Sequence, residues 1–548
     1  MADIRGNVLH SKQKDEAEEF STRFIIRMMN MARQELMESG DRDWMVDCVA
    51  QASVRLSHIE GLSRRVASGL AKLGFGPGQI LHTAYNTCLD FYWPVFGAWL
   101  NGGIVSVADP LLSADLAKGQ LEDTRATIVV CTADAAVKYV EANKKMKETL
   151  RVKHILVIDK EPWQELPKGC TSFKSLYNDD GSKCPQASGL PKYDSEEVAV
   201  IHWTSGTSGK PKGVMQTQRY LHRMMKPSKL PPRSISLSSN IMFHAGAFLL
   251  PLDGGIMNKF TCCLIREEDF SGSKALEVIS DYKPSFYMAG TNHVLAVASL
   301  ERESHDLSSL FCIMPAGGAV SAATARKLKS LFPNLAMVYQ FYGSTEVSGI
   351  SGSFDVTCLG ALLPGVQVYI RDRETGEKLG TNKSGEIMAK TKTMMTGYLN
   401  RYDETKEFYD EEGYAHMGDL GYYDEEGKLY YQERIKELIK VSNYWFGPGE
   451  VENVLEEISC VAEAAVWGTY DNNSGDDLVN AAIVLTTGPK LEVITREDIT
   501  NHIANNLQIQ KHITGNIIFL DSIPHNPQGK KLRRKLKAKY SGKLIKLL

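Results

Sequence analysis

Short apolar runs alternate with helical patterns through the first part of the chain, and this alternation restricts the fold more than any other feature. Residues 60–73 carry leucine and valine at helical spacing, and the apolar run ILHTAY follows at 80–85. A second helical stretch at 90–103 leads to another apolar run, IVSVAD, at 104–109. Such periodicities predict helices and buried strands in alternation. Strands that alternate with helices form parallel sheets with helices on their faces, so the sequence predicts an α/β fold.

The pattern changes near residue 430, where a second unit begins. The stretch GPGEVENVLEEI at 447–458 predicts a helix, and the apolar runs at 462–470 and 477–487 predict strands. Thr495 and Asp498 have the spacing of a capping box, which marks the start of a further helix. These elements predict a small α+β unit at the end of the chain.

A chain of 548 residues is too long for a single hydrophobic core. We expect a large N-terminal lobe of parallel or mixed sheets covered by helices at 1–431, a hinge at 432–436, and a small mobile α+β lid at 437–548. The oligomeric state stays open.

The overall charge is close to balance, with a net charge of −3 and 24% charged residues. This balance predicts no nucleic-acid partner, and no apolar run reaches the length of a membrane span, so no integral membrane segment is expected. The N-terminal residues are polar, unlike a signal peptide. The final residues, Lys-Leu-Leu, fall short of the Ser-Lys-Leu peroxisomal address. We therefore expect a cytoplasmic protein, with the peroxisome as the alternative.

The stretch HWTSGTSGKPKGVM at 202–215 is rich in Gly, Ser, Thr and Lys and follows an apolar run. Glycine lets backbone N–H groups approach an anion closely, while hydroxyls and lysines add donors and charge. The stretch therefore predicts a phosphate-binding loop. The alternative is a flexible surface turn, because the same residues also mark ordinary loops.

Three later stretches add residues suited to nucleotide chemistry. In QFYGSTEVSG at 340–349, Glu346 is a hard oxygen ligand of the kind that Mg²⁺ prefers. Asp419 lies close to two glycines and suits the two hydroxyls of a ribose, although an Asx-turn is the alternative. Arg434 could reach a phosphate or ribose. Lys530 follows a glycine and opens a basic run, for which a solvated helix face is the alternative.

In this order, these stretches resemble the adenylate-forming superfamily, which includes acyl-CoA synthetases, 4-coumarate–CoA ligases and insect luciferase-like enzymes. The matching segments are TSGTSGKPKGV, AGGAVS, YGSTE, GYLNRYDET, MGD, ERIKELIK and NPQGKKLRR. The resemblance implies that a small carboxylic acid attacks the α-phosphate of ATP, that pyrophosphate leaves, and that the thiol of CoA then displaces AMP. ATP, Mg²⁺ and CoA are thus the expected cofactors, and the small lobe is expected to turn between the two half-reactions.

The resemblance also assigns roles to individual residues. The expected phosphate loop comprises Thr204, Ser205, Gly206, Thr207, Ser208, Gly209 and Lys212. The adenine side comprises Gly317, Gly318 and Ala319, with Tyr342 stacking and Gly343 and Ser344 beside it. Thr345 would contact the α-phosphate and Glu346 would hold Mg²⁺. Asp419 and Arg434 would bind the ribose. Lys530 would serve adenylation, while Lys440, on another face of the lid, would serve thioester formation.

Several positions depart from the family pattern. Phe341 replaces a glycine that usually floors the acyl pocket, so it either shortens the tunnel or turns into the core. His244, Phe248, Phe341 and Gly349 are the expected pocket residues. Asn443 replaces a glycine of the thiol channel, and Glu433 stands where Asp is more frequent.

The resulting hypothesis is an acid–CoA ligase for a fatty or aryl acid. The main alternative is a luciferase-like monooxygenase that oxidises a luciferyl-adenylate with light emission. Two further hypotheses are a non-catalytic nucleotide-binding relative and a stand-alone domain that loads a carrier protein in trans.

Overall fold

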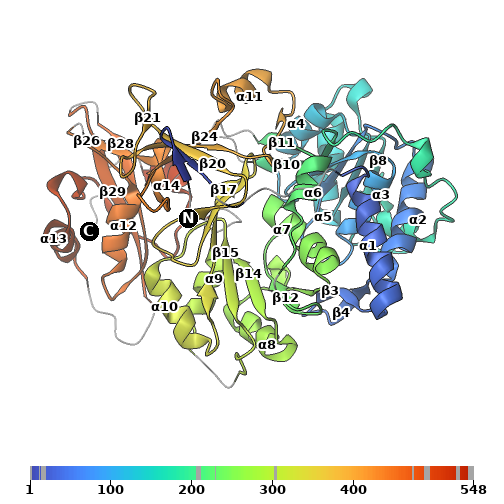
Figure 1. The fold of residues 1–548 in the computed structure, drawn as a ribbon, viewed down its shortest axis with the longest axis horizontal. Helices are drawn as coiled ribbons and strands as arrows, with labels where there is room; N and C mark the ends of the chain where they lie inside the picture. Colours follow the sequence, from blue (N-terminus) through green and yellow to red (C-terminus); the bar gives the residue numbers. More distant parts are fainter. Residues whose placement is uncertain are drawn as a thin grey trace.

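The protein is described from a computed structural model that covers residues 3–11, 13, 20–204, 211–228, 230–301, 305–442, 444–471, 474–486, 494–525 and 531–540. Figure 1 shows a large lobe, which carries the helices from α1 (Phe24–Ser39) to α11 (Tyr402–Phe408), and a smaller unit at the opposite end of the view. The predicted fold class is confirmed.

The first sheet of the large lobe has eight strands. In spatial order they are β23 (Gly397–Tyr398), β11 (Lys212–Thr217), β10 (Val198–Thr204), β6 (Ile104–Val107), β5 (Ile80–Ala84), β7 (Ile128–Cys131), β8 (His154–Val157) and β9 (Thr171–Ser172). The strands from β10 to β9 pair in parallel, and β11 and β23 pair antiparallel at one edge. Helices α2 (His58–Lys72) and α3 (Tyr92–Leu100) pack together, and every residue of the apolar α3 is buried.

The second sheet has seven strands and is mainly parallel. Its order is β16 (Met337–Val338), β15 (Cys312–Ala316), β14 (Phe286–Gly290), β12 (Ile235–Ser238), β13 (Thr261–Leu264), β3 (Asp43–Asp47) and β4 (Ala52–Arg55). Helices α8 (Gly272–Tyr282), α9 (Thr291–Ala298) and α10 (Ala322–Leu331) contribute apolar residues to one core with this sheet. The parallel pairing explains why its strands are apolar runs rather than alternating ones.

An antiparallel sheet completes the large lobe and carries one part of the site. Its order is β1 (Asp3–Arg5), β2 (Val8–His10), β20 (Gln367–Arg371), β22 (Gly385–Lys390), β24 (Ala415–Tyr423) and β25 (Leu429–Arg434). Buried and half-buried residues alternate along β24, as expected of a strand with one face on a core. A short sheet of β17 (Gln340–Ser344), β18 (Ser348–Ser353) and β19 (Ala361–Leu362) supplies the other part.

The small unit combines a three-stranded sheet with three helices. The strands are β28 (Val461–Tyr470), β29 (Asp477–Leu485) and β30 (Ile517–Phe519), and the helices are α12 (Pro448–Glu456), α13 (Arg496–Asn506) and α14 (Arg533–Tyr540). A hairpin of β26 (Ile439–Val441) and β27 (Tyr444–Phe446) precedes them. The expected capping box is present at the start of α13, where Thr495 and Asp498 each accept the other's backbone N–H. The domain boundaries at 431 and 437 stay a prediction.

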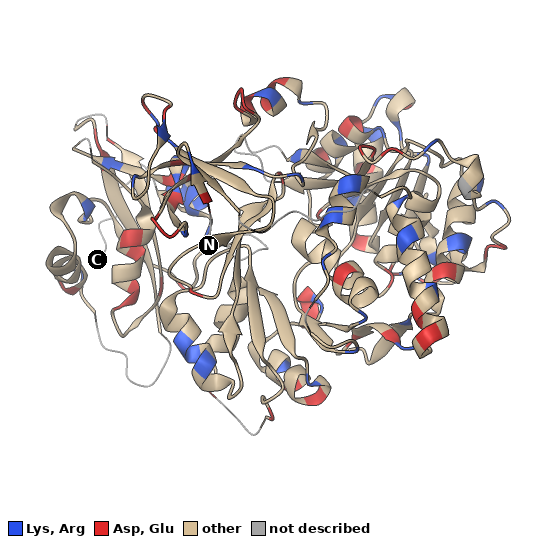
Figure 2. Cartoon of the chain, viewed as in Figure 1, with Lys and Arg blue, Asp and Glu red and all other residues tan. Residues whose placement is uncertain are grey.

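Acidic and basic residues are interspersed along the helices of both parts of the molecule (Figure 2). Within the described ranges, no helix has both the length and the apolar character that a membrane crossing requires.

Candidate active site

Asp419 is buried between an aromatic and a basic side chain. It lies within the nine-residue strand β24 and is 1% exposed, so the alternative of an Asx-turn is wrong. The Tyr342 hydroxyl donates a hydrogen bond to Asp419 Oδ2 at 2.6 Å, and Arg434 Nε lies 2.9 Å from Asp419 Oδ1. Burial, and then the Asp419 charge, raise the pKa of Tyr342 far above its usual range, so the phenol keeps its proton.

The pairing of β24 with β25 explains how residues from two motifs meet here. Asp419 is directly opposite Arg434 in the register of these antiparallel strands. Arg434 Nη1 also donates to the Met417 carbonyl at 3.1 Å, which fixes the guanidinium over the strand. The structure therefore brings together three of the predicted nucleotide residues, Tyr342, Asp419 and Arg434.

The loop at 317–319, predicted to line the adenine, is exposed and held at both ends. The Thr291 hydroxyl lies 2.8 Å from the Gly318 carbonyl, to which it donates, and Gln340 Oε1 accepts the Val320 N–H at 2.9 Å. Gly317 has a φ of 86°, a left-handed conformation that glycine adopts without strain. Gln340 stands two residues before Tyr342, so this bond ties the loop to β17, the strand that carries Tyr342.

Glu346 and Lys212 meet around a tyrosine that was not among the predicted site residues. The Tyr398 hydroxyl donates to Glu346 Oε1 at 3.0 Å, and the Lys212 ammonium lies 4.8 Å from the centre of the Tyr398 ring. Lys212 also pairs with Glu404. Burial, and then Glu346, raise the pKa of Tyr398. A half-buried carboxylate with one oxygen fixed by a phenol fits a hard cation such as Mg²⁺.

Thr204 and Lys212 are the described ends of the predicted phosphate loop. They are partners in the antiparallel pairing of β10 with β11. Ser205, Gly206, Thr207, Ser208 and Gly209 lie outside the described residues, and so do Lys530 and Asn443. Their predicted roles stay predictions.

The β17–β18 hairpin has glycines at positions where a side chain would collide with neighbouring atoms. Gly343 and Gly349 are partners in its register. A Cβ atom at Gly343 would lie 2.0 Å from the Ser348 carbonyl oxygen, and one at Gly349 would lie 2.8 Å from Leu363 Cδ1. The hairpin holds Ser344, Thr345 and Glu346 at its turn.

Phe341 does not enter the core, so that alternative is wrong. Its side chain is 47% exposed on β17, while the neighbouring Tyr342 is buried. The ring packs edge-on against Tyr339, with 4.5 Å between ring centres. Its effect on the acyl tunnel stays a prediction.

The other two pocket candidates come from α7 (Ala245–Leu250). His244 is the N-cap residue of this helix, and burial lowers its pKa to about 4, so the imidazole is neutral at pH 7. Phe248 is fully buried and packs among Phe91, Tyr92 and Trp99. The structure thus places Phe248 in the core cluster behind His244.

Two buried polar residues that the sequence did not indicate connect the α7 region with Thr345. Gln216 Nε2 donates to the Thr345 carbonyl at 3.0 Å, and Gln216 Oε1 lies 2.9 Å from His202 Nδ1. Because the amide nitrogen faces a carbonyl, the amide oxygen must accept from the imidazole, so His202 Nδ1 carries the proton. His202 lies edge-on to Phe248 at 5.1 Å. His202 stands in the quoted glycine-rich stretch, but its spacing gave no signal of this role.

Lys440 belongs to the small unit, on β26. Its backbone N–H donates to Asp477 Oδ2 at 2.9 Å, and its ammonium lies 5.8 Å from the centre of the Trp445 ring. These contacts fix the strand and leave the charged end of the side chain against an exposed indole.

The fold is α/β, and it buries the Asp419 carboxylate between Tyr342 and Arg434, residues that the sequence predicts to bind a nucleotide. Residues 38–399 match the family model described as AMP-binding enzyme, and residues 450–530 match the AMP-binding enzyme C-terminal domain. The chain belongs to the AMP-binding enzyme family, which confirms the predicted adenylate-forming superfamily.

The curated relatives include 4-coumarate–CoA ligase from Pinus taeda, which is 29% identical over 93% of this chain and 94% of its own length. 4-Coumarate–CoA ligase 2 from Petroselinum crispum is also 29% identical, over 94% of both chains. The identity is spread over nearly the whole length of each protein, including both matched domains.

Solved structures share the fold at lower identity. ATP-bound MatB from Rhodopseudomonas palustris has a TM-score of 0.80 at 19% identity, covering 94% of this chain and 99% of its own. The luciferase-like enzyme from the nonluminescent mealworm Zophobas morio has a TM-score of 0.67 at 22% identity, covering 77% of this chain and 99% of its own.

Proposed function

We propose that this protein activates an aromatic carboxylic acid with ATP and then transfers it to CoA. The observation that carries the proposal is the buried Asp419 carboxylate, held by Tyr342 and Arg434. Carboxylate oxygens accept hydrogen bonds, so Asp419 is suited to the hydroxyls of a ribose. The 317–319 loop, which Gln340 ties to the strand of Tyr342, is proposed to take the base. The protein is an AMP-forming acid–CoA ligase, and the comparisons do not favour the luciferase-like alternative.

The reaction has two balanced steps. An oxygen of the substrate carboxylate bonds to the α-phosphorus of ATP while the bond to pyrophosphate breaks. The CoA thiolate then bonds to the acyl carbon, and AMP leaves with the electron pair of the broken acyl–oxygen bond. Catalysis of this kind depends on positioning and on donors at the developing charge. Thr345, Lys212 and Lys530 are the residues proposed to supply those donors.

We place the magnesium ion at Glu346. When bound, Mg²⁺ would neutralise phosphate charge and hold the oxygens of the leaving group. The chain's own part is the orientation of the carboxylate, because the Tyr398 hydroxyl fixes one oxygen at 3.0 Å. Lys212, on the other side of Tyr398, adds positive charge to the same region.

The aromatic class of the acid is supported by the relatives and by the surroundings of His244. The relatives are named for 4-coumarate, an aryl acid. The ring of Phe243 lies 4.6 Å from that of His244, and His244 is neutral at pH 7. A neutral imidazole beside an aromatic ring suits a flat acid better than a flexible chain.

Exchange of labelled pyrophosphate into ATP, measured over a panel of aryl and fatty acids, tests the proposal. We expect acid-dependent exchange that needs Mg²⁺ and is fastest with aryl acids. Asp419→Asn should reduce it by about tenfold or more, because a charged acceptor for the ribose is lost. A folded protein that binds ATP but shows no exchange with any acid would contradict the proposal. Exchange only with fatty acids would contradict the aromatic class alone.

A further inference from the structure

Helix α12 begins without a capping side chain of its own. Gly447 is its N-cap residue and Pro448 follows, so the N-cap position has no side chain that could accept a hydrogen bond from the first turn. The first turn of a helix exposes N–H groups that need an acceptor, and a negative charge is favourable there. The acceptor in this protein comes from another part of the chain.

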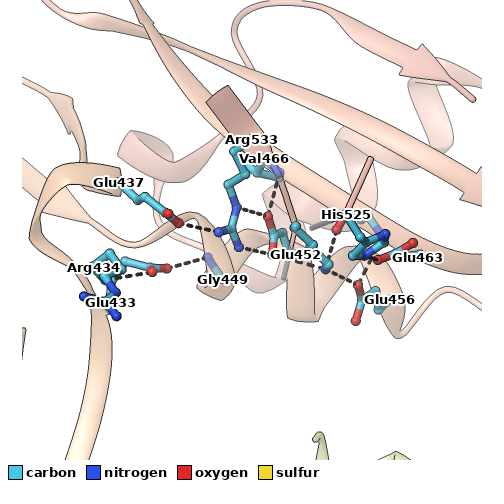
Figure 3. Close-up of polar contacts among 12 residues, drawn as sticks. Glu433, Arg434, Glu437, Gly449, Glu452, Glu456, Glu463, Val466, His525 and Arg533 are labelled. Carbon is cyan, nitrogen blue, oxygen red and sulfur yellow. Dashed lines mark hydrogen bonds and ion pairs between the residues drawn. The ribbon is translucent and has the colours of Figure 1, made fainter. Parts of the chain in front are cut away.

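Glu433 supplies that acceptor from β25, an edge strand of the antiparallel sheet in the large lobe. It lies on β25, opposite Leu420 of β24, and directly precedes the ribose-side residue Arg434. Glu433 Oε2 accepts the Gly449 N–H at 3.2 Å, while Oε1 accepts the Arg434 N–H at 2.8 Å and the Tyr431 hydroxyl at 3.1 Å. The residue is 5% exposed. Figure 3 shows the carboxylate between Arg434 and Gly449.

Gly447 leaves space for this contact. Its φ of −83° is open to any residue, so the backbone conformation does not require glycine. A Cβ atom at Gly447 would however lie 2.8 Å from Glu433 Cβ, and one at Gly449 would lie 3.3 Å from Glu433 Oε2. Because Gly447 and Gly449 have no side chains, the start of α12 can pack directly against the Glu433 side chain.

A buried ion-pair network supports the same contact from the lid side (Figure 3). Arg533 of α14 pairs with Glu452 of α12 at 2.7 Å and with Glu437 of the turn that follows β25. Lys531 pairs with Glu456 at 2.9 Å, which fastens the start of α14 to the same helix. These ion pairs connect the turn after β25 with α12 and α14.

We propose that Glu433 is a positioning residue that holds the small unit in one of its two working orientations. It caps α12 from the large-lobe side, and Gly447 and Gly449 form the seat. The proposal rests on the proposed function and on the expectation that the small lobe turns between its two half-reactions. The contact with Gly449 requires a glutamate at position 433. An aspartate is one methylene shorter and would not reach from β25 to the Gly449 N–H in the same way.

Two variants test it by disturbing the contact from opposite sides. Glu433→Gln keeps the shape and removes the charge, and Gly447→Ala inserts a methyl group into the seat. Each should change the ratio of the two half-reaction rates by about fivefold, the equivalent of one helix cap, and both in the same direction. The half-reactions are pyrophosphate exchange and thioester formation from pre-formed acyl-adenylate.

Glu450→Gln is the matched control, because it removes a carboxylate from the same turn of α12. Glu450 pairs with Lys511 inside the small unit and not with β25. Its substitution should leave the ratio of the two rates unchanged within about twofold. Hydrogen exchange of the 447–451 backbone provides a readout that needs no activity, and it should become faster in Glu433→Gln than in Glu450→Gln.

An equal fall of both half-reactions in Glu433→Gln, or opposite changes of the ratio in the two test variants, would overturn the proposal. Unchanged backbone exchange in Glu433→Gln would overturn it as well. If the parent protein catalyses neither half-reaction, the proposed function fails, whereas the exchange comparison still decides whether Glu433 holds α12.

Discussion

Tyr342 shows how one hydroxyl serves the nucleotide site. Its hydrogen bond fixes Asp419 Oδ2, the carboxylate proposed to hold the ribose. Tyr342→Phe keeps the ring and removes the donor to a buried carboxylate, which typically costs about 1.5–3 kcal/mol. We expect KM for ATP to rise by at least about tenfold, with KM for the acid little changed, in steady-state kinetics.

Tyr369→Phe is the control for that prediction. Tyr369 lies on β20, in the antiparallel sheet that carries Asp419, and donates to Asp410 Oδ2 at the same distance, 2.6 Å. It should leave KM for ATP unchanged. Equal effects of the two substitutions would mean that Tyr342 acts through the sheet and not on the nucleotide.

The sequence indicated Tyr342, Asp419 and Arg434, because few residue types suit a base or a ribose, and the structure brings these three together. It did not indicate Tyr398, Gln216 and His202. Tyr398 reaches Glu346 only because β23 pairs with β11, and the register of strands far apart in the chain is not written in either segment. In the sequence, Glu433 differed from the family pattern only by standing where Asp is more frequent. Its contact with Gly449 depends on how the large lobe and the small unit pack together.

The segment that follows α7 gives a test at the level of one element. Residues Pro251–Met257 form a π-helix that follows the His244 helix directly, and Asp253 within it accepts the Lys226 N–H at 2.9 Å. Burial raises the pKa of Asp253 to about 6. The folded protein therefore binds this proton more tightly than the unfolded chain does. Its contribution to stability is present at low pH and is lost as pH rises through about 6.

Asp253→Asn removes that titration and keeps an acceptor for Lys226. The stability of the variant relative to the parent should increase between pH 4 and pH 7, by at most about 3 kcal/mol. Urea unfolding midpoints at the two pH values measure the change. A relative stability that falls over this range would show that the charged Asp253 is favourable in the folded protein.

Among the individual elements, sequence periodicity correctly predicted strands that are buried on both faces. The runs at 80–85 and 104–109 became β5 and β6 because parallel strands under helices need continuous apolar residues. Short elements were harder. The segment before the YGSTE stretch has only the two-residue strand β16, because it lies at the edge of its sheet and pairs on one side.

In the whole molecule, the large lobe and the small unit are connected through the few residues at the end of β25 and the turn that follows it. Arg434 belongs to the ribose site, Glu433 caps α12, and Glu437 pairs with Arg533. The contact with α12 and the contact with Asp419 are therefore made by two adjacent residues, Glu433 and Arg434. This arrangement connects the candidate site directly to the small unit.

The central claim is that the protein is an AMP-forming acid–CoA ligase, and the most direct test identifies its products. The protein is mixed with ATP, Mg²⁺ and the best aryl acid, quenched, and analysed by mass spectrometry before and after CoA is added. The account predicts acyl-adenylate and pyrophosphate first, and then acyl-CoA and AMP in equal amounts. Formation of ADP and phosphate, or an adenylate that CoA does not consume, would contradict it.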